Sequence, residues 1–420
     1  MSAPRKIRID DLAAPVLSEV QRAALAYGES QRVELSVPAV LAAAVERTGL
    51  DDFGPPEFRE RLALWLGEVD RDPERTGLGR AGLYADCVRY AANRLRIRDL
   101  LERHPEIHEQ QIRAPIVVVG LPRSGTTHLV NLIAADQRLR SMPLWEGQEP
   151  VPDPRERPGA DGVDPRRRRS AEAWEQFRST APLIAAMHPM EPDHIHEELE
   201  LLCPDFTSYN LEWIARVPGW RDYYLAHDQT EHYVHYLLPA LKILQWYRPR
   251  ERWVLKSPQH LEQLGPLLAA FPDATIVMTH RDPVSVVQSA ATMLAYGARM
   301  TYRTPRPGFY LDYWSDRMRR LLEASLRDRP LLPAGRTIDV LFHEFMADDV
   351  ATVERIYAAA GLPMTPEARA QILAYLAAHP RGKEGQVVYD LRVDFGVEPA
   401  ALRAPFGFYL DRFPVRIEVN

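Results

Sequence analysis

The segment IVVVGLPRSGTTH, residues 116–128, decides how the rest of the chain is interpreted. Its branched apolar run, 116–119, predicts a buried strand, and the glycines at 120 and 125 predict a tight loop that leads into a helix. Such a layout is an anion cradle, because backbone N–H groups at a helix start point at the bound anion. Nucleotide triphosphatases carry GxxxxGK[ST], with lysine after the second glycine. Here that position holds Thr126, and the cation is Arg123, inside the loop.

The loop favours a sulfuryl donor over ATP. Backbone N–H groups and the hydroxyls of Ser124, Thr126 and Thr127 would bind a phosphate, with Arg123 beside the transferred group. Phosphoryl transfer usually recruits magnesium, held in part by a carboxylate at the end of a neighbouring strand. The next long apolar strand, TIVMTH (275–280), is followed by arginine instead. A sulfuryl group carries less negative charge, so fixed cations can stabilise its transfer without a metal.

Composition narrows the class of protein. The chain has 420 residues, and 46% apolar content is enough for a sizeable core. It contains no apolar run of membrane-spanning length, and its N-terminal residues lack the apolar core of a signal peptide. The two cysteines, Cys87 and Cys203, follow no metal or redox spacing, which favours free buried thiols and a cytoplasmic protein. A net charge of −6 argues against nucleic acid as a partner.

Periodicity divides the chain into two parts. Residues 1–110 show helical apolar spacing and are expected to form a helical N-terminal extension that caps the main domain, 111–420. Three further strands, 253–256, 275–280 and 337–342, alternate with helices, which predicts a parallel sheet covered on both faces.

A long insert is expected at about 150–250. Its first part, 150–170, is rich in Pro, Gly and charge, which predicts an exposed loop that contains Arg166 to Arg169. The second part, 171–250, carries aromatic residues at helical spacing, Trp213 and Trp220 among them. Such residues either pack a helical insert or line a substrate pocket, and core packing is the expectation for any one of them.

A second anion site is expected in HRDPVSVVQS, residues 280–289. Arg281 leaves the strand, Asp282 precedes a helix that starts at proline, and Ser285 and Ser289 lie one turn apart on that helix. An arginine at a strand end and a helical serine can share one phosphate. The same pattern also fits an Arg281–Asp282 ion pair that caps the helix.

Three motifs together resemble sulfotransferases that use 3′-phosphoadenosine 5′-phosphosulfate (PAPS): GLPRSGTT at 120–127, RDPVSVVQS at 281–289 and HPRGKEG at 379–385. TGLDDFG (48–54) and YDLRVDFG (389–396) further resemble a bacterial branch with its own helical N-terminal extension. The resemblance implies a P-loop three-layer α/β/α sandwich with a central parallel sheet. In that fold the N-terminal extension and the helical insert shape the acceptor site.

The resemblance also implies the residues that bind PAPS. The first loop would hold the 5′-phosphosulfate, and the later motifs would hold the 3′-phosphate; the residues are Arg123, Ser124, Gly125, Thr126, Thr127, Arg281, Ser289, Arg381, Gly382 and Lys383. Many relatives have lysine at the Arg123 position. Arginine does not give up its proton near neutral pH, so Arg123 should stabilise charge instead of acting as a general acid. Lys256 aligns with another cation near the sulfate, and it is one of only four lysines in the chain.

The catalytic base is the point where the sequence departs from the family. Cytosolic relatives place a histidine where this chain has Pro258. Glu146 lies close to the position of the glutamate in the tyrosylprotein enzymes, and burial could raise its pKa toward neutrality. An ion pair or loop hydrogen bond would also account for Glu146, and His260 is the reserve candidate.

The segment HIHEELELL, 194–202, groups histidines and glutamates whose role the sequence leaves open. Metal-binding helices usually need two histidines four residues apart, and His194 and His196 are two apart, so no metal site is expected.

The sequence therefore predicts an O-sulfotransferase. It would move a sulfuryl group from PAPS to a hydroxyl of an apolar small molecule or lipid by metal-free in-line transfer, releasing adenosine 3′,5′-bisphosphate. A nucleoside or nucleotide kinase and a catalytically silent nucleotide-binding regulator are the alternatives. The acceptor's identity and the oligomeric state, a homo-oligomer included, are left open.

Overall fold

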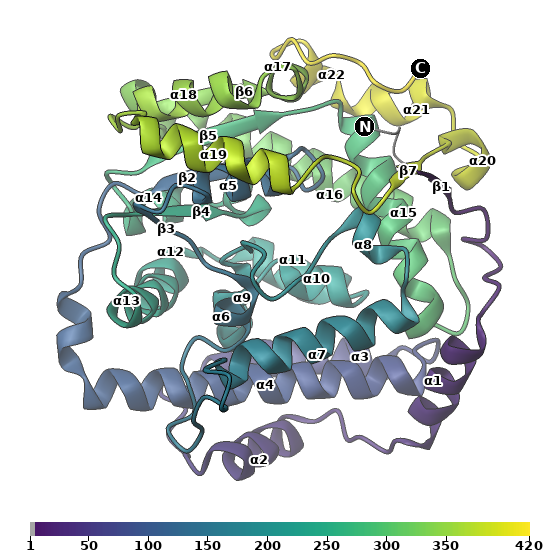
Figure 1. The fold of residues 1–420 in the computed structure, drawn as a ribbon. Helices are drawn as coiled ribbons and strands as arrows, with labels where there is room; N and C mark the ends of the chain where they lie inside the picture. Colours follow the sequence, from purple (N-terminus) through teal and green to yellow (C-terminus); the bar gives the residue numbers. More distant parts are fainter. Residues whose placement is uncertain (1–4) are drawn as a thin grey trace.

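A five-stranded parallel sheet forms the centre of the computed structural model, which describes residues 5–420 (Figure 1). The strands run in the order β3-β4-β2-β5-β6. Their bounds are β2 Ile116–Gly120, β3 Leu139–Arg140, β4 Arg252–Lys256, β5 Thr275–His280 and β6 Thr337–Leu341. The four strands expected from sequence are confirmed. β3 was missed because two residues give no periodicity to read.

Alternate strand residues enter two separate cores, which makes the sheet the middle of three layers. Val117, Leu255 and Ile276 pack on one face, and Ile116 and Val277 pack on the other. The first face is covered by α13 (Leu238–Tyr247), α14 (Leu264–Ala270), α15 (Pro283–Thr301) and α16 (Pro307–Asp328); the second is covered by α5 (Thr126–Ala134), α17 (Phe342–Ala347), α18 (Asp349–Ala359) and α19 (Pro366–Ala378). The three-layer α/β/α sandwich is confirmed, because strands buried on both faces need helices on both.

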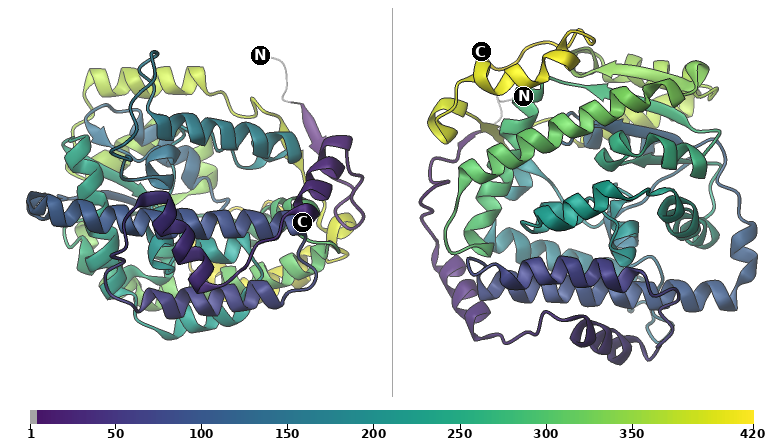
Figure 2. Two further views of the ribbon diagram at one scale, coloured as in Figure 1. Left: turned by 90° about the horizontal axis from the view of Figure 1, so that it is seen from below. Right: turned by 180° about the vertical axis from the view of Figure 1, so that it is seen from behind.

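The N-terminal helices lie beneath this sandwich in Figure 1 and in the right view of Figure 2. They are α1 (Glu19–Ser30), α2 (Val37–Thr48), α3 (Phe58–Arg71) and α4 (Gly77–Arg103). Trp65 of α3 and Cys87 of α4 share one core with Cys203 and with Trp220 of α11 (Pro218–Ala226). The helical extension is therefore packed directly against the insert. Both cysteines are buried and free.

A short strand ties the two ends of the described chain together. β1 (Lys6–Arg8) pairs in parallel with β7 (Gln386–Val388), directly after the HPRGKEG motif (Figure 1). The remaining short helices are α6 (Leu144–Gln148), α8 (Ile184–Met187), α9 (Leu199–Leu202), α10 (Asn210–Ile214), α12 (Thr230–His232), α20 (Leu391–Phe395), α21 (Pro399–Arg403) and α22 (Gly407–Leu410). Across residues 5–420, no helix combines the length and the apolar character that crossing a membrane requires.

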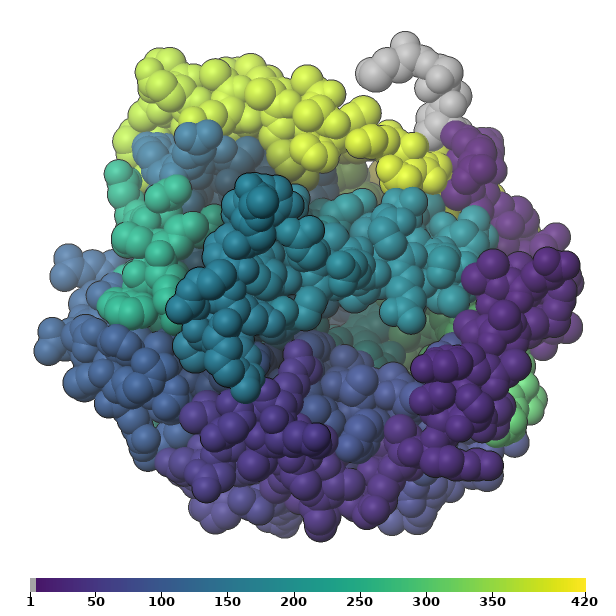
Figure 3. Space-filling model, turned by 60° about the horizontal axis from the view of Figure 1, so that its bottom comes forward, coloured from purple at the N-terminus to yellow at the C-terminus, as the bar shows by residue number. Residues whose placement is uncertain are grey.

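The prediction of an exposed loop over 150–170 was wrong for its last residues, 165–170, which are helical. Helix α7 (Pro165–Thr180) begins there, with Asp164 accepting the backbone N–H of Arg166 at its start. Arg166 is buried, pairs with Asp164 and lies 4.7 Å above the Trp145 ring. The other three arginines form ion pairs as well, with Asp193, Asp161, Glu149 and Glu156. In Figure 3 this dark teal segment lies between the purple N-terminal helices and the yellow-green C-terminal part.

Candidate functional site

The loop between β2 and α5 is a tight turn with little room for side chains. A Cβ atom added to Gly120 would lie 1.9 Å from the Thr279 hydroxyl oxygen, so this position requires glycine. Gly125 has φ +85°, and Arg123 also adopts a left-handed conformation, with φ +67°. A non-glycine residue in this region costs energy and is frequent at functional sites. The Ser124 hydroxyl bonds the Leu121 carbonyl and Thr279 (2.6 and 2.8 Å), so it supports the loop from inside.

Arg123, Arg281 and Ser289 come together, although 158 and 166 residues separate Arg123 from the other two. The Arg123 Nε donates to the Ser289 hydroxyl over 3.0 Å, and Arg281 Nη1 donates to the Arg123 carbonyl over 2.6 Å. Ser289 in turn donates to the Tyr389 hydroxyl over 3.0 Å. The first and second anion motifs therefore form one contiguous cationic cluster.

Arg281 already holds an oxyanion of the chain itself. Its Nε and Nη2 donate to the two carboxylate oxygens of Glu418 (2.8 and 2.7 Å), and the Ser285 hydroxyl donates to the same carboxylate (3.3 Å). The alternative Arg281–Asp282 ion pair is not formed. Asp282 instead accepts the backbone N–H of Val284 at the start of α15 and that of Glu418.

Lys256, the last residue of β4, is buried beside the cradle. Its ammonium group donates to the Thr127 hydroxyl over 3.2 Å and forms an ion pair with Glu197. Its backbone N–H donates to Glu198, whose other oxygen lies 2.8 Å from His260 Nε2. The HIHEELELL segment is thereby anchored to the end of β4, and Glu197 faces the cradle.

The two bases considered from sequence lie elsewhere. One carboxylate oxygen of Glu146 accepts from both Arg140 (2.8 Å) and Arg248 (3.1 Å), which is the ion-pair environment weighed for it. His260 is buried, with Tyr233 on one ring nitrogen and Glu198 on the other. Neither Glu146 nor His260 lines the pocket that contains the cradle residues.

The HPRGKEG motif is not gathered into the Arg281 cluster. Arg381 pairs with Asp349 and donates to the Met346 carbonyl at the α17–α18 junction. Gly382 has φ +75°, and Lys383 is exposed. Closure of these residues over a phosphate stays a prediction.

A pocket of about 550 Å³ begins at the cradle and extends into apolar surroundings. Arg123, Thr126, Thr127, Glu197 and Pro258 line one end. Aromatic side chains line its walls: Phe177, Trp213, Tyr302, Phe309, Tyr310 and Trp314. Of the insert's aromatics, Phe177 and Trp213 line the pocket, whereas Trp220 and Tyr224 pack in the core, which is the packing expected for any one of them. The sequence analysis missed the aromatics of α16, whose helical spacing in PGFYLDYW was the available signal.

Four carboxylates line this pocket, namely Asp86, Glu197, Glu200 and Glu212. Asp86 and Glu200 pair with Arg89, and Glu212 pairs with Arg317. Burial raises the pKa of Glu200, which Arg89 partly offsets. Only Glu197 has the cradle's lysine as its partner.

Histidines also face the cradle. His188 and His196 line the pocket, with ring centroids 5.9 Å apart. Burial, followed by the charges of Arg123 and Lys256, lowers the pKa of His188 to about 3. Burial also holds the pKa of His196 well below its ordinary value. Within 5–420, no cluster of three or more His, Cys, Asp or Glu side chains is arranged to hold a metal ion.

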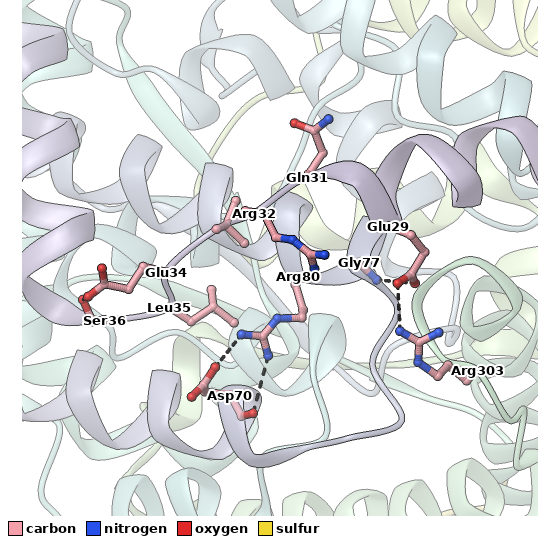
Figure 4. Close-up of a pocket in the computed structure, with 11 residues that line it drawn as sticks. Glu29, Gln31, Arg32, Glu34, Leu35, Ser36, Asp70, Gly77, Arg80 and Arg303 are labelled. Carbon is pink, nitrogen blue, oxygen red and sulfur yellow. Dashed lines mark hydrogen bonds and ion pairs between the residues drawn. The ribbon is translucent and has the colours of Figure 1, made fainter.

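A second hollow, of about 620 Å³, lies between the α1–α2 connection and α4 (Figure 4). Four of its charged side chains form two ion pairs, Arg80 with Asp70 and Arg303 with Glu29, the latter over 3.0 Å. The backbone N–H of Gly77 also donates to Glu29. None of the cradle residues lines it, so it is separate from the site.

Comparison with known proteins agrees with this geometry. A model of the sulfotransferase family matches residues 115–366. Sulfotransferase STF9 from Mycobacterium avium is similar in structure, with 26% identity and a TM-score of 0.82 over 93% of this chain and 100% of that one. Sulfotransferase STF1 from Mycobacterium tuberculosis H37Rv has 27% identity and a TM-score of 0.76, over 89% and 98%. Among curated proteins, no sequence matches the chain.

Proposed function

Since this chain belongs to the sulfotransferase family, we propose that it transfers a sulfuryl group from PAPS to the hydroxyl of an apolar small molecule or lipid. The observation that carries this proposal is the pocket of about 550 Å³. It joins the cradle residues Arg123, Thr126 and Thr127 to aromatic walls in one continuous space. A cationic end suits a charged donor group, and an apolar body suits the acceptor.

The donor would bind through two anion sites. The start of α5, with Gly125, Thr126 and Thr127, would hold the 5′-phosphosulfate, because its backbone N–H groups are free to bind an anion. Arg281 and Ser289 would hold the 3′-phosphate. The Glu418 carboxylate on Arg281 supports this assignment, because it accepts two N–H groups of the same guanidinium, as a phosphate would.

The transfer step needs charge stabilisation and a base. Arg123 and Lys256 would stabilise the charge on the sulfuryl oxygens and on the leaving phosphate oxygen, so a metal is not required. Glu197 would accept the acceptor's proton as the acceptor oxygen bonds to sulfur and the sulfur–phosphate oxygen bond breaks. Adenosine 3′,5′-bisphosphate would leave with the electron pair of that bond.

Calorimetric titration with adenosine 3′,5′-bisphosphate tests the donor site. We expect it to bind more tightly than its 2′,5′ isomer and than ATP with or without magnesium. Arg281→Ala should weaken binding about 30- to 150-fold, because a two-point charged contact is worth about 2–3 kcal/mol. Arg355→Ala, which removes an exposed arginine of α18, is the matched control. Tighter binding of ATP with magnesium would favour the kinase alternative.

Turnover tests the reaction itself. PAPS labelled with ³⁵S should transfer label to a hydroxyl acceptor from a panel of phenols and long-chain alcohols, and EDTA should leave the rate unchanged. Tight nucleotide binding with no transfer to any acceptor would favour the silent regulatory protein. The cytoplasmic location expected from the sequence stays a prediction.

A further inference from the structure

Two arginines lie together in the wall of the apolar pocket. Arg75 comes from the segment before α4, and Arg216 comes from the segment between α10 and α11; both line the pocket. Arg75 is only 2% exposed. The guanidinium carbons lie 4.5 and 3.6 Å from the centre of the same ring, that of Tyr302. Arg75 and the backbone N–H of Arg216 both donate to the Tyr302 hydroxyl.

Much of the hydrogen-bonding capacity of these two guanidinium groups is unused. The Nε and Nη1 atoms of Arg75, and the Nε and Nη2 atoms of Arg216, are buried without a hydrogen-bond partner. In the described part of the chain, neither side chain forms an ion pair with a carboxylate. Burial lowers the pKa of Arg75. Tyr302, Tyr310 and Asp72 oppose that shift, and the charge of Arg216 adds to it. Two neighbouring cations, one of them buried, that have no ion-paired carboxylate are costly unless a ligand supplies an anion.

Other buried arginines of the chain form ion pairs with carboxylates. Arg317 is completely buried in α16, and it pairs with both Glu212 and Glu262. Arg94 and Arg61 share Asp205. Cation–π contacts with Tyr302, Phe309 and Tyr310 surround Arg216 but leave its Nε and Nη2 atoms without a hydrogen-bond partner. Among the described residues, Arg75 and Arg216 therefore form a cationic pair that has no ion-paired carboxylate.

Backbone pairing holds the pair in place. Thr76 N–H donates to the Thr301 carbonyl (3.1 Å), and Arg303 N–H donates to the Glu74 carbonyl (2.7 Å). These bonds attach the N-terminal extension to the end of α15, so the extension supplies one cation and the insert supplies the other.

We propose that Arg75 and Arg216 bind an anionic group of the acceptor, a carboxylate, so that the acceptor is an apolar hydroxy acid. The hydroxyl lies at the cradle and the apolar body lies along the aromatic walls. The position of the hydroxyl rests on the proposed function. The carboxylate site does not, because it is an equilibrium binding site within the same pocket.

Calorimetry without donor tests the anion site directly. The probes are 10-hydroxydecanoate and its methyl ester, which differ in charge but share the apolar chain and the hydroxyl. We expect the acid to bind at least tenfold more tightly than the ester. Equal binding of the two, or no binding of the acid, would overturn the inference.

Substitutions test whether Arg216 and Arg75 produce the preference for the acid over the ester. Arg216→Gln should reduce the acid-to-ester ratio about tenfold, and Arg75→Gln should do the same if the variant folds. Arg221→Gln is the control, because Arg221 also lies over a tyrosine but pairs with Asp222 outside the pocket. An acid preference that survives both pocket substitutions would place the anion elsewhere and overturn the inference.

A parallel titration with adenosine 3′,5′-bisphosphate distinguishes failure of the anion site from failure of the proposed function. Nucleotide binding without acid preference rejects the anion site alone. Acid preference without nucleotide binding rejects the proposed function and upholds the anion site.

Discussion

Arg123 combines a strained backbone with a side chain that is held on one side of the cradle. Its left-handed conformation, φ +67°, costs about 1–3 kcal/mol and persists only because the surroundings enforce it. The carbonyl of the same residue accepts from Arg281, and its side chain donates to Ser289 and to the Met187 carbonyl. The strain is therefore balanced by contacts that join the two anion motifs. A single residue links the proposed sulfuryl end of the donor to its proposed 3′-phosphate end.

The two glutamate candidates for the base can be separated by substitution. Glu197→Gln should lower kcat about 100- to 1,000-fold with nucleotide affinity nearly unchanged, because it removes a proton acceptor but keeps the side chain's shape. Glu146→Gln should chiefly lower the melting temperature, because it weakens two ion pairs of a buried carboxylate. Single-turnover kinetics and thermal unfolding measure the two effects. A large loss of kcat in Glu146→Gln at unchanged melting temperature, with Glu197→Gln active, would restore the prediction made from sequence.

At the scale of elements, the start of α15 brings the C-terminal segment onto Arg281. Asp282 holds the backbone N–H of Glu418, and this places the Glu418 carboxylate on Arg281. Both side chains are partly exposed, 20% for Arg281 and 26% for Glu418, so the pair is weak enough to be exchanged. The C-terminal segment thus occupies the proposed 3′-phosphate position.

Neutralising Glu418 should therefore tighten nucleotide binding. In Glu418→Gln we expect adenosine 3′,5′-bisphosphate to bind about 3- to 10-fold more tightly, because the phosphate no longer displaces or faces a carboxylate. Titration calorimetry measures the change. The control is Glu398→Gln, which removes an exposed partner of Arg392 away from the cluster. Weaker binding in Glu418→Gln would mean that the carboxylate orients Arg281 for the phosphate instead of competing with it.

A buried three-ion cluster joins the elements under the pocket. Arg317 of α16 binds Glu212 of α10 and Glu262 of the turn after β4, over 2.9 and 2.6 Å. Arg317→Leu should cost about 3–5 kcal/mol of unfolding free energy, because it leaves two carboxylates buried without a cation. Urea unfolding measures this loss. Arg320→Leu on the exposed face of the same helix should change stability by under about 0.5 kcal/mol. Similar losses of unfolding free energy in both variants would show that the buried cluster contributes no more to stability than an exposed ion pair.

At the scale of the whole molecule, the sequence predicts what local patterns encode and misses what distant partners decide. The strands were predictable because Ile116–Val119 and Thr275–His280 are apolar runs buried on both faces. The burial of Arg166 depends on Trp145 and Asp164. Glu146 pairs with Arg140 and Arg248, and Arg75 and Arg216 both contact Tyr302. No local spacing in the sequence predicts these contacts. The cradle was therefore predictable, whereas the surroundings of each candidate base were not.

Packing of the insert over the cradle also makes the stability of the whole chain depend on pH. Burial lowers the pKa values of His188, His194 and His196, to about 3 for His188 and about 4 for His194. In the unfolded chain these groups titrate near about 6.5, so below that pH only the unfolded state takes up their protons. The folded state should therefore lose stability as pH falls from about 6.5 toward 5, a window in which most carboxylates are still ionised in both states.

Each such histidine contributes a slope of up to about 1.4 kcal/mol per pH unit in this window. His196→Gln should therefore flatten the fall in unfolding free energy by about 1 kcal/mol between pH 6.5 and 5.5. His235→Gln is the control, because this side chain, shortly after α12, is exposed and forms an ion pair with Glu231. Urea unfolding at both pH values measures the slopes. A slope in His196→Gln equal to that of the unmodified chain would mean that His196 gains its proton in the folded state over the same pH range as in the unfolded chain.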